Sequence, residues 1–236
     1  MISKSNGSGF WHNVSATKMI VRTVGVLCGL SGLEHGFFET LQGNVKPVGL
    51  MIDAIGPANR FWPGGTEPAL TVIPNFLITG ILAMTASLVV ILWSAMFIHR
   101  KAGMAGLLLL SILQFLVGGG FVQIFLVVMT AAAGTQIDAS LAWYRAILPG
   151  GIRRSLAKVW LWLFILFLLS FFGSISAAIF GYFPVISNLF DMSADNLVNF
   201  LFQIAYFMLG LLVLTILAGF AHDVGRQANP RQQAVR

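Results

Sequence analysis

The sequence predicts an all-α fold, a polytopic transmembrane helical bundle in which six spans are favoured and five are possible. Of the 236 residues, 57% are hydrophobic and only 9% are charged, whereas a soluble globular domain carries roughly 25% charged residues. Several apolar stretches also reach the roughly 18 to 20 residues that a helix needs to cross a bilayer. They are continuous and rich in Leu and Phe, which excludes the short alternating strands of a transmembrane β-barrel.

Five apolar stretches follow one another along the chain, at about residues 19–41, 70–99, 102–134, 156–183 and 197–221. The third stretch is too long for a simple span and has a triglycine, Gly118 to Gly120, at its middle. Glycine accepts the positive φ angles that a tight reversal needs. This stretch is therefore a hairpin of two short spans, a re-entrant turn, or one long tilted helix.

The distribution of Lys and Arg favours the hairpin, because these residues concentrate in cytoplasmic loops. Five spans would divide the 14 basic residues nine to five between the two sides of the membrane. A hairpin at the triglycine divides them twelve to two and leaves only Lys46 and Arg60 outside. We therefore expect six spans with both termini cytoplasmic, in the inner or plasma membrane of a prokaryotic cell.

A single transmembrane domain is expected over residues 19–221, between a cytoplasmic leader at 1–18 and a cytoplasmic tail at 222–236. The leader is polar and lacks the apolar core of a secretory signal peptide. Four Pro and five Gly between residues 42 and 69 exclude a continuous helix there, so an ordered outer loop is expected. Apolar and aromatic side chains next to Arg suggest that the segment 135–155 lies on the cytoplasmic membrane surface.

Ionisable residues stand out at the outer end of the first apolar stretch. His35 and Glu39 are four residues apart, a spacing that brings them together on one helix face, and Glu34 adjoins them. Ionisable side chains within a membrane segment are costly, and most of them face a protein interior or a water-filled cavity. We therefore expect a proton or ion site formed by His35, Glu39 and Glu34. The alternative is that these side chains lie in the headgroup layer.

A His paired with a carboxylate can also supply two ligands to a divalent metal. The outer loop holds Asp53 and Glu67 as further carboxylates, so the candidate metal ligands are His35, Glu39, Asp53 and Glu67. One His with scattered acids has no diagnostic spacing. Cys28 is the only cysteine, which excludes a cysteine-cluster metal site, and the sequence does not specify a cofactor.

Two further sets of residues have an expected place in the bundle. Four glycines share one narrow face of the first helix, which small residues make suitable for close helix packing. These glycines are Gly25, Gly29, Gly32 and Gly36. In the hairpin arrangement, Gln114 and Gln123 flank the triglycine at similar depth, so they are candidates to line a polar pore or substrate path.

Three strings carry a resemblance to known proteins: GLEHGFFETLQGN at 32–44, IDAIGPANRFWPGG at 52–65 and EPALTVIPNFLITGIL at 67–82. They resemble strings of an uncharacterised family of small prokaryotic polytopic membrane proteins. The resemblance covers roughly the first half of the chain. It implies a prokaryotic, membrane-embedded setting, and it brings no activity and no functional residue with it.

The preferred functional hypothesis is a small transporter or ion-conducting protein with a His/Glu proton or cation site near the outer face. One alternative is an accessory or assembly subunit of a larger membrane complex. Another is a membrane metalloenzyme that uses His35, Glu39 and the loop carboxylates. No Walker loop, dinucleotide fingerprint or zinc-protease motif is present in the sequence, so no catalytic residue is assigned and an enzyme is the less favoured class.

The lipid bilayer is the expected partner of the chain, together with other membrane subunits or further copies of the chain itself. The net charge of +6 does not indicate a nucleic-acid partner. The basic residues flank apolar segments, where they contact anionic lipid headgroups.

Overall fold

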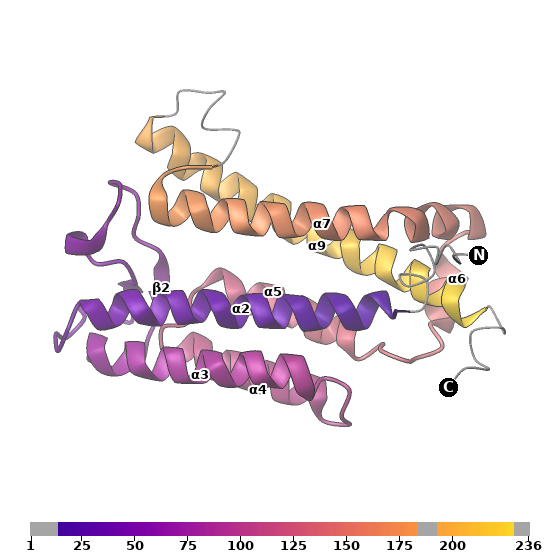
Figure 1. Cartoon of the computed structure of the whole chain (residues 1–236), viewed down its shortest axis with the longest axis horizontal. Coiled ribbons are helices and arrows are strands. Elements are labelled where there is room, and N and C mark those ends of the chain that lie inside the picture. The colour runs from indigo at the N-terminus through magenta and orange to yellow at the C-terminus, as the bar shows by residue number, and fades with distance from the viewer. Residues whose placement is uncertain (1–13, 184–192, 229–236) are drawn as a thin grey trace, which may run out of the picture.

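Helices make up nearly all the regular structure of the chain (Figure 1). The computed structural model describes residues 14–183 and 193–228. Most of the predicted leader and the end of the predicted tail therefore lie outside the described residues. The helices are α2 (Ala16–Leu41), α3 (Phe76–Met96), α4 (Gly103–Leu116), α5 (Val122–Gly134), α6 (Ala142–Ile147), α7 (Gly150–Phe180) and α9 (Ala194–Gln227).

Four of these helices are long and apolar enough to cross a membrane, as the composition predicts. They are α2, α3, α7 and α9, with 26, 21, 31 and 34 residues. In contrast, α4 and α5 have only 14 and 13 residues, fewer than the roughly 17 residues of the shortest common spans. The described residues therefore do not form six spans of full length. It has four helices of spanning length and one short helical pair.

The short pair arises because the chain reverses at the triglycine. Helix α4 ends at Leu116, α5 begins at Val122, and the two helices contact each other. Gly118 and Gly120 have φ angles of +99° and +93°, which residues with a Cβ rarely adopt. The alternative of one long tilted helix is therefore wrong, and the third apolar stretch is a short helical hairpin.

The glycine face of α2 packs against α3. A Cβ added to Gly36 would lie 2.7 Å from the carbonyl oxygen of Gly80, and a Cβ added to Gly80 would lie 2.5 Å from the carbonyl oxygen of Gly36. The two helix backbones thus touch at this point, which only small residues allow. Gly25, Gly29 and Gly32 also lie against α3 side chains. Because α3 occupies this face, another subunit cannot dock on it.

Helices α7 and α9 pack along each other and form a second layer beside α2, α3, α4 and α5 (Figure 1). Most of the contact between the layers is made by α9, which touches α2 and α5. Figure 1 shows α9 closest to α2 where α2 begins and further away where α2 ends. We call the end of the bundle where α2 begins, at Ala16, the basic end. The opposite end, where α2 finishes at Leu41, is the loop end.

A carboxylate of α9 connects the two layers by hydrogen bonds at the basic end. Asp223 accepts hydrogen bonds from the backbone N–H groups of Ala16 and Thr17 at 2.9 and 3.0 Å, and from the hydroxyl of Ser15 at 2.9 Å. The first N–H groups of a helix have no partner within it, and the helix dipole favours negative charge there. Asp223 therefore caps the N-terminus of α2.

The loop between α2 and α3 is ordered, as expected, and folds back onto the bundle. It contains a two-stranded antiparallel sheet, β1 (Met51–Asp53) with β2 (Pro68–Leu70), and the short 3-10 helix η1 (Pro57–Asn59). Trp62 donates its indole N–H to the carbonyl of Ala178 in α7 at 2.9 Å. Thus the loop joins the two layers at the loop end.

The segment expected on the membrane surface, residues 135–155, is divided between two helices. Helix α6 is only 6 residues long, and α7 already begins at Gly150. This start is earlier than the apolar pattern suggests, and Pro149 stands immediately before the first helical residue, a position at which proline is compatible with a helix. Tyr144 is buried and donates its hydroxyl to the carbonyl of Leu217 at 2.8 Å. Helix α6 therefore packs against α9.

The backbone contact between α2 and α3 predicts a strong effect of one methyl group. We expect Gly36→Ala to destabilise the protein by about 1–3 kcal/mol, because its Cβ would meet backbone atoms of Gly80 and Met84 within 2.9 Å. Gly210→Ala in α9 is the matched control, because a Cβ there meets nothing within 4 Å. Thermal unfolding in detergent measures both variants. Equal melting temperatures for the two variants would contradict the close α2–α3 contact.

Candidate functional site

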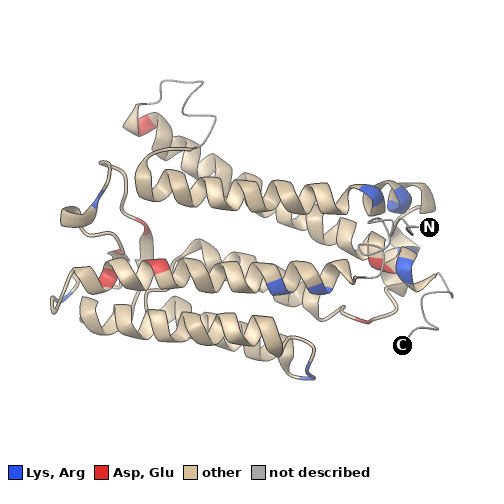
Figure 2. Cartoon of the chain, in the orientation of Figure 1, with Lys and Arg blue, Asp and Glu red and all other residues tan. Residues whose placement is uncertain are grey.

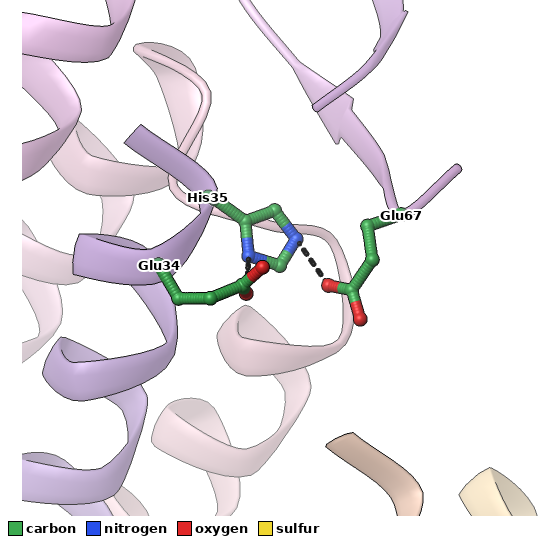
Figure 3. Close-up of side chains that lie close together, drawn as sticks. All are labelled: Glu34, His35 and Glu67. Carbon is green, nitrogen blue, oxygen red and sulfur yellow. Dashed lines mark ion pairs between the residues drawn. The ribbon is translucent and has the colours of Figure 1, made fainter. Parts of the chain in front are cut away.

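The candidate site is centred on His35, in the part of α2 nearest the loop end. The His35 side chain is buried, with an exposed fraction of 3%. Its Nδ1–H donates a hydrogen bond to the carbonyl of Ser31, one helical turn earlier, at 3.0 Å. This bond within the helix fixes the ring, so that Nε2 faces away from α2 (Figure 3).

Two carboxylates flank the imidazole (Figure 3). One Glu34 oxygen lies 3.1 Å from Nδ1 of His35, and one Glu67 oxygen lies 3.1 Å from Nε2. The sequence hypothesis includes Glu34 in the site, although its helical-wheel position diverges from that of His35. The long Glu34 side chain reaches back to the ring and makes this contact.

Glu67 comes from the long loop, immediately before β2. Its backbone carbonyl accepts a hydrogen bond from the N–H of Ala54 at 2.9 Å, so the antiparallel pairing holds it in place. Its φ angle is +51°, in the left-handed region that residues with a Cβ rarely occupy. The sheet thus holds the loop in a strained conformation that directs this carboxylate to His35.

Glu39 lies one turn beyond His35 and has no exposed surface. The structure places its carboxylate against the triglycine turn, where a Cβ on Gly118 would lie 2.3 Å from one of its oxygens. Neither oxygen accepts a hydrogen bond from any described residue. The spacing of His35 and Glu39 predicts their direct contact, but the ion-pair partners of His35 are Glu34 and Glu67.

The two glutamines named as path candidates have different surroundings. Gln123 of α5 donates to the hydroxyl of Ser31 and lies on a cavity described below. Gln114 of α4 is buried and donates its amide to the carbonyl of Cys28 at 2.9 Å. Thus the described structure places Gln123 beside the site and gives Gln114 a contact between α4 and α2.

The four candidate metal ligands do not all come together. Asp53 pairs with Arg60 at 2.9 Å and is half exposed. The potential ligand atoms of Glu34, His35 and Glu67 all lie within 4.8 Å of one another. Among the described residues this is the group of His and carboxylate side chains that has the geometry to hold a metal ion.

A cavity of about 290 Å³ adjoins the cluster. It lies between the two layers, with walls from α2, α5, α7, α9 and the long loop. Most of its lining is apolar, and Phe121, Phe171 and Phe202 contribute aromatic rings. The imidazole of His35 and the carboxylate of Glu67 supply its ionisable groups. A cavity with apolar walls and a few convergent polar groups is the usual form of a small-molecule or ion site.

The electrostatics of the cluster are dominated by burial. Burial raises the pKa of the Glu67 carboxyl to about 7; the nearby His35 charge opposes this shift, and the negative charge of Glu34 adds to it. A carboxylate removed from water is costly unless positive charge or hydrogen bonds accompany it. The site therefore favours species that neutralise its carboxylates.

No protein-family model, curated protein or solved structure matches the chain. The prokaryotic family suggested by three sequence strings stays a prediction. The functional argument consequently depends on the geometry of the site.

The contact between the triglycine turn and Glu39 predicts that Gly118→Ala lowers the stability of the protein by more than backbone strain alone would. Both Gly118→Ala and the control Gly43→Ala place a Cβ at positive φ, which costs about 1–2 kcal/mol. Only at Gly118 would the Cβ strike Glu39, since nothing lies within 4 Å of such a Cβ at Gly43. We expect Gly118→Ala to lower the melting temperature further than Gly43→Ala does.

A double-mutant cycle tests the cause of this difference. In a Glu39→Ala background, the additional cost of Gly118→Ala should disappear, because the carboxylate that it strikes is gone. If the additional cost persists in that background, Glu39 is not the group that restricts residue 118.

Proposed function

We propose that this chain is a small integral membrane transport or ion-conducting protein, and that the cluster around His35 is its proton or cation site. The observation that carries the proposal is a buried imidazole in contact with two carboxylates, with the buried carboxylate of Glu39 one helical turn away, at the wall of a cavity between two helix layers.

The charge of the cluster supports a cationic ligand. Glu34, Glu39 and Glu67 bring up to three negative charges, and His35 brings at most one positive charge. Among the described residues, no Lys or Arg forms an ion pair with any of these carboxylates. Buried charges in membrane proteins are paired or serve an ion path. A bound cation would supply the positive charge that the described chain does not.

The position of the cavity supports transport. Many membrane transporters bind their substrate between two groups of helices and expose it by moving one group against the other. Here the layers are fastened at the basic end by Asp223, and the cavity lies between them beside His35. A relative movement of α7 and α9 would change access to the cluster while the contact at the basic end persists, and it would require the Trp62–Ala178 hydrogen bond at the loop end to break.

The distribution of charge supports a topology in which the loop end faces outward. Lys and Arg gather at the basic end, where α2 begins and α9 ends (Figure 2). Of the described basic residues, Lys46 and Arg60 are the ones that lie in the long loop. We propose that the short hairpin adds two shallow crossings to the four long helices. Both termini would then be cytoplasmic, in a prokaryotic inner or plasma membrane.

Reporter enzymes test this topology. A reporter that is active only outside the cytoplasm should be active when inserted after Gly49, in the exposed part of the long loop. The same reporter should be inactive when fused after Gln136, which follows the hairpin. External activity at Gln136 would contradict the topology with both termini cytoplasmic.

Ion flux into reconstituted vesicles tests the function. With an imposed inside-negative potential, we expect the protein to admit protons or divalent cations, read by a pH-sensitive or metal-sensitive dye inside the vesicles. His35→Ala and Glu39→Gln should each reduce this flux by at least about tenfold, because each removes an ionisable group from the site. Asp53→Asn, a loop carboxylate outside the cluster, is the matched control and should leave the flux unchanged.

The variants are compared at equal amounts of folded protein, judged by size-exclusion elution and melting temperature. Normal flux through folded His35→Ala and Glu39→Gln would overturn the proposal. So would wild-type vesicles that admit ions no faster than empty ones.

A further inference from the structure

We infer that Glu34, His35 and Glu67 form a binding site for a divalent first-row transition metal of the Zn²⁺ class. This inference deepens the proposed function, because it names the cation that the cluster takes. Its geometric basis is independent of whether the cation is then transported.

The hydrogen bond of His35 prepares the ring for a metal. A carbonyl oxygen can only accept, so the bond to Ser31 at 3.0 Å places the proton on Nδ1. The neutral ring then carries a free lone pair on Nε2, which faces the Glu67 carboxylate. Metal-bound histidines commonly donate the other ring N–H to a backbone carbonyl or carboxylate, which fixes the tautomer and the ring orientation.

The spacing of Nε2 and the Glu67 oxygen fits two ligands of one metal. Zn²⁺ binds imidazole nitrogen and carboxylate oxygen at roughly 2.0–2.2 Å, so two neighbouring ligands of a tetrahedral site lie about 3.3–3.5 Å apart. The observed separation is 3.1 Å. A small rotation of the Glu67 side chain would complete this pair of bonds.

Glu34 supplies the third group. All three potential ligand atoms lie within 4.8 Å of one another. The buried oxygens of Glu34 accept no hydrogen bond from the described chain, although one of them lies 3.1 Å from Nδ1 of His35. Glu34 thus serves either as a direct ligand or as the carboxylate that orients the imidazole. Both roles place its negative charge beside the metal.

A third carboxylate, that of Glu39, indicates that positive charge is needed here. Both oxygens of Glu39 are buried and accept no hydrogen bond from any described residue. This side chain is one turn from His35 on α2. A divalent ion in the cluster would offset the charge of Glu39 as well as that of its own ligands.

The ligand set and its surroundings define the class of metal. One imidazole nitrogen with carboxylate oxygens suits Zn²⁺, Mn²⁺, Fe²⁺ or Co²⁺, whereas Ca²⁺ and Mg²⁺ prefer oxygen ligands alone. Three protein groups leave at least one coordination position open. His35 and Glu67 both line the cavity of about 290 Å³, so water or an exchanging ligand could fill this position.

Metal binding by the purified full-length chain tests the site. Protein without an affinity tag is treated with a chelator, and Zn²⁺ and Co²⁺ are then titrated by calorimetry and by visible absorption of Co²⁺. We expect about one tightly bound ion per chain and a Co²⁺ spectrum of low coordination number. Mg²⁺ at the same concentrations should give no detectable binding.

Variants identify the ligands. Glu67→Gln and His35→Asn should weaken Zn²⁺ binding by more than about 100-fold, and Glu34→Gln by at least about 10-fold. Asp53→Asn is the control and should bind as the wild type does, because its carboxylate pairs with Arg60 outside the cluster. Each variant is first checked for the elution volume of the wild type. X-ray absorption of the zinc-loaded wild type supplies evidence that needs no variant, and it should show nitrogen and oxygen ligands including one imidazole.

The outcomes separate this inference from the proposed function. Unchanged Zn²⁺ affinity in folded His35→Asn would overturn the metal site. An X-ray absorption spectrum of the zinc-loaded wild type that shows no imidazole ligand would also overturn it. If the wild type binds no metal but its proton flux depends on His35, the metal site fails and the transport proposal stands. Binding through His35 without any ion flux would support the metal site and overturn transport.

Discussion

The short hairpin of α4 and α5 determines how the rest of the loop end is built. With 14 and 13 residues, these helices cannot cover the whole of α2, which has 26. His35 and Glu39 lie on α2 beside the turn of the hairpin, where the regular helices α4 and α5 end, and ionisable groups exposed to lipid are costly. The long loop fills this space, bridging from Thr71 to Val117 of the hairpin. Glu67 is thereby brought to His35, and Gly118 closes over Glu39.

Much of the helical framework could be predicted because its signals are strong and local. Long apolar stretches locate the four long helices, and the division of Lys and Arg favours a reversal at the triglycine, which the structure contains. The lengths of α4 and α5 could not be predicted, since apolar residues continue through the turn region and do not mark where regular hydrogen bonding stops. Likewise, α7 begins at Gly150, before its apolar stretch, because a helix can extend through polar residues once a bundle supports it.

The site could be predicted only in part, for a related reason. His35, Glu39 and Glu34 stand out in sequence because ionisable residues are rare in an apolar helix. Which of these side chains contact each other could not be predicted. A glutamate side chain has several rotatable bonds, so the position of the residue on the helix does not fix where its carboxylate lies. Glu67 could be named as an available acid, but its approach depends on two strands of 3 residues each. Strands this short have no alternation of polarity from which a register can be inferred.

The cap that Asp223 places on α2 joins the first described helix to the last, across 207 positions of sequence. Synthesis proceeds from the N-terminus, so α2 enters the membrane long before its capping carboxylate exists. Until α9 has been inserted, the first amides of α2 must find other partners at the membrane surface. An incomplete chain therefore differs from a complete one at its very beginning. The hydrogen bonds from Ala16 and Thr17 to Asp223 therefore form only when the first and last described helices are both in place.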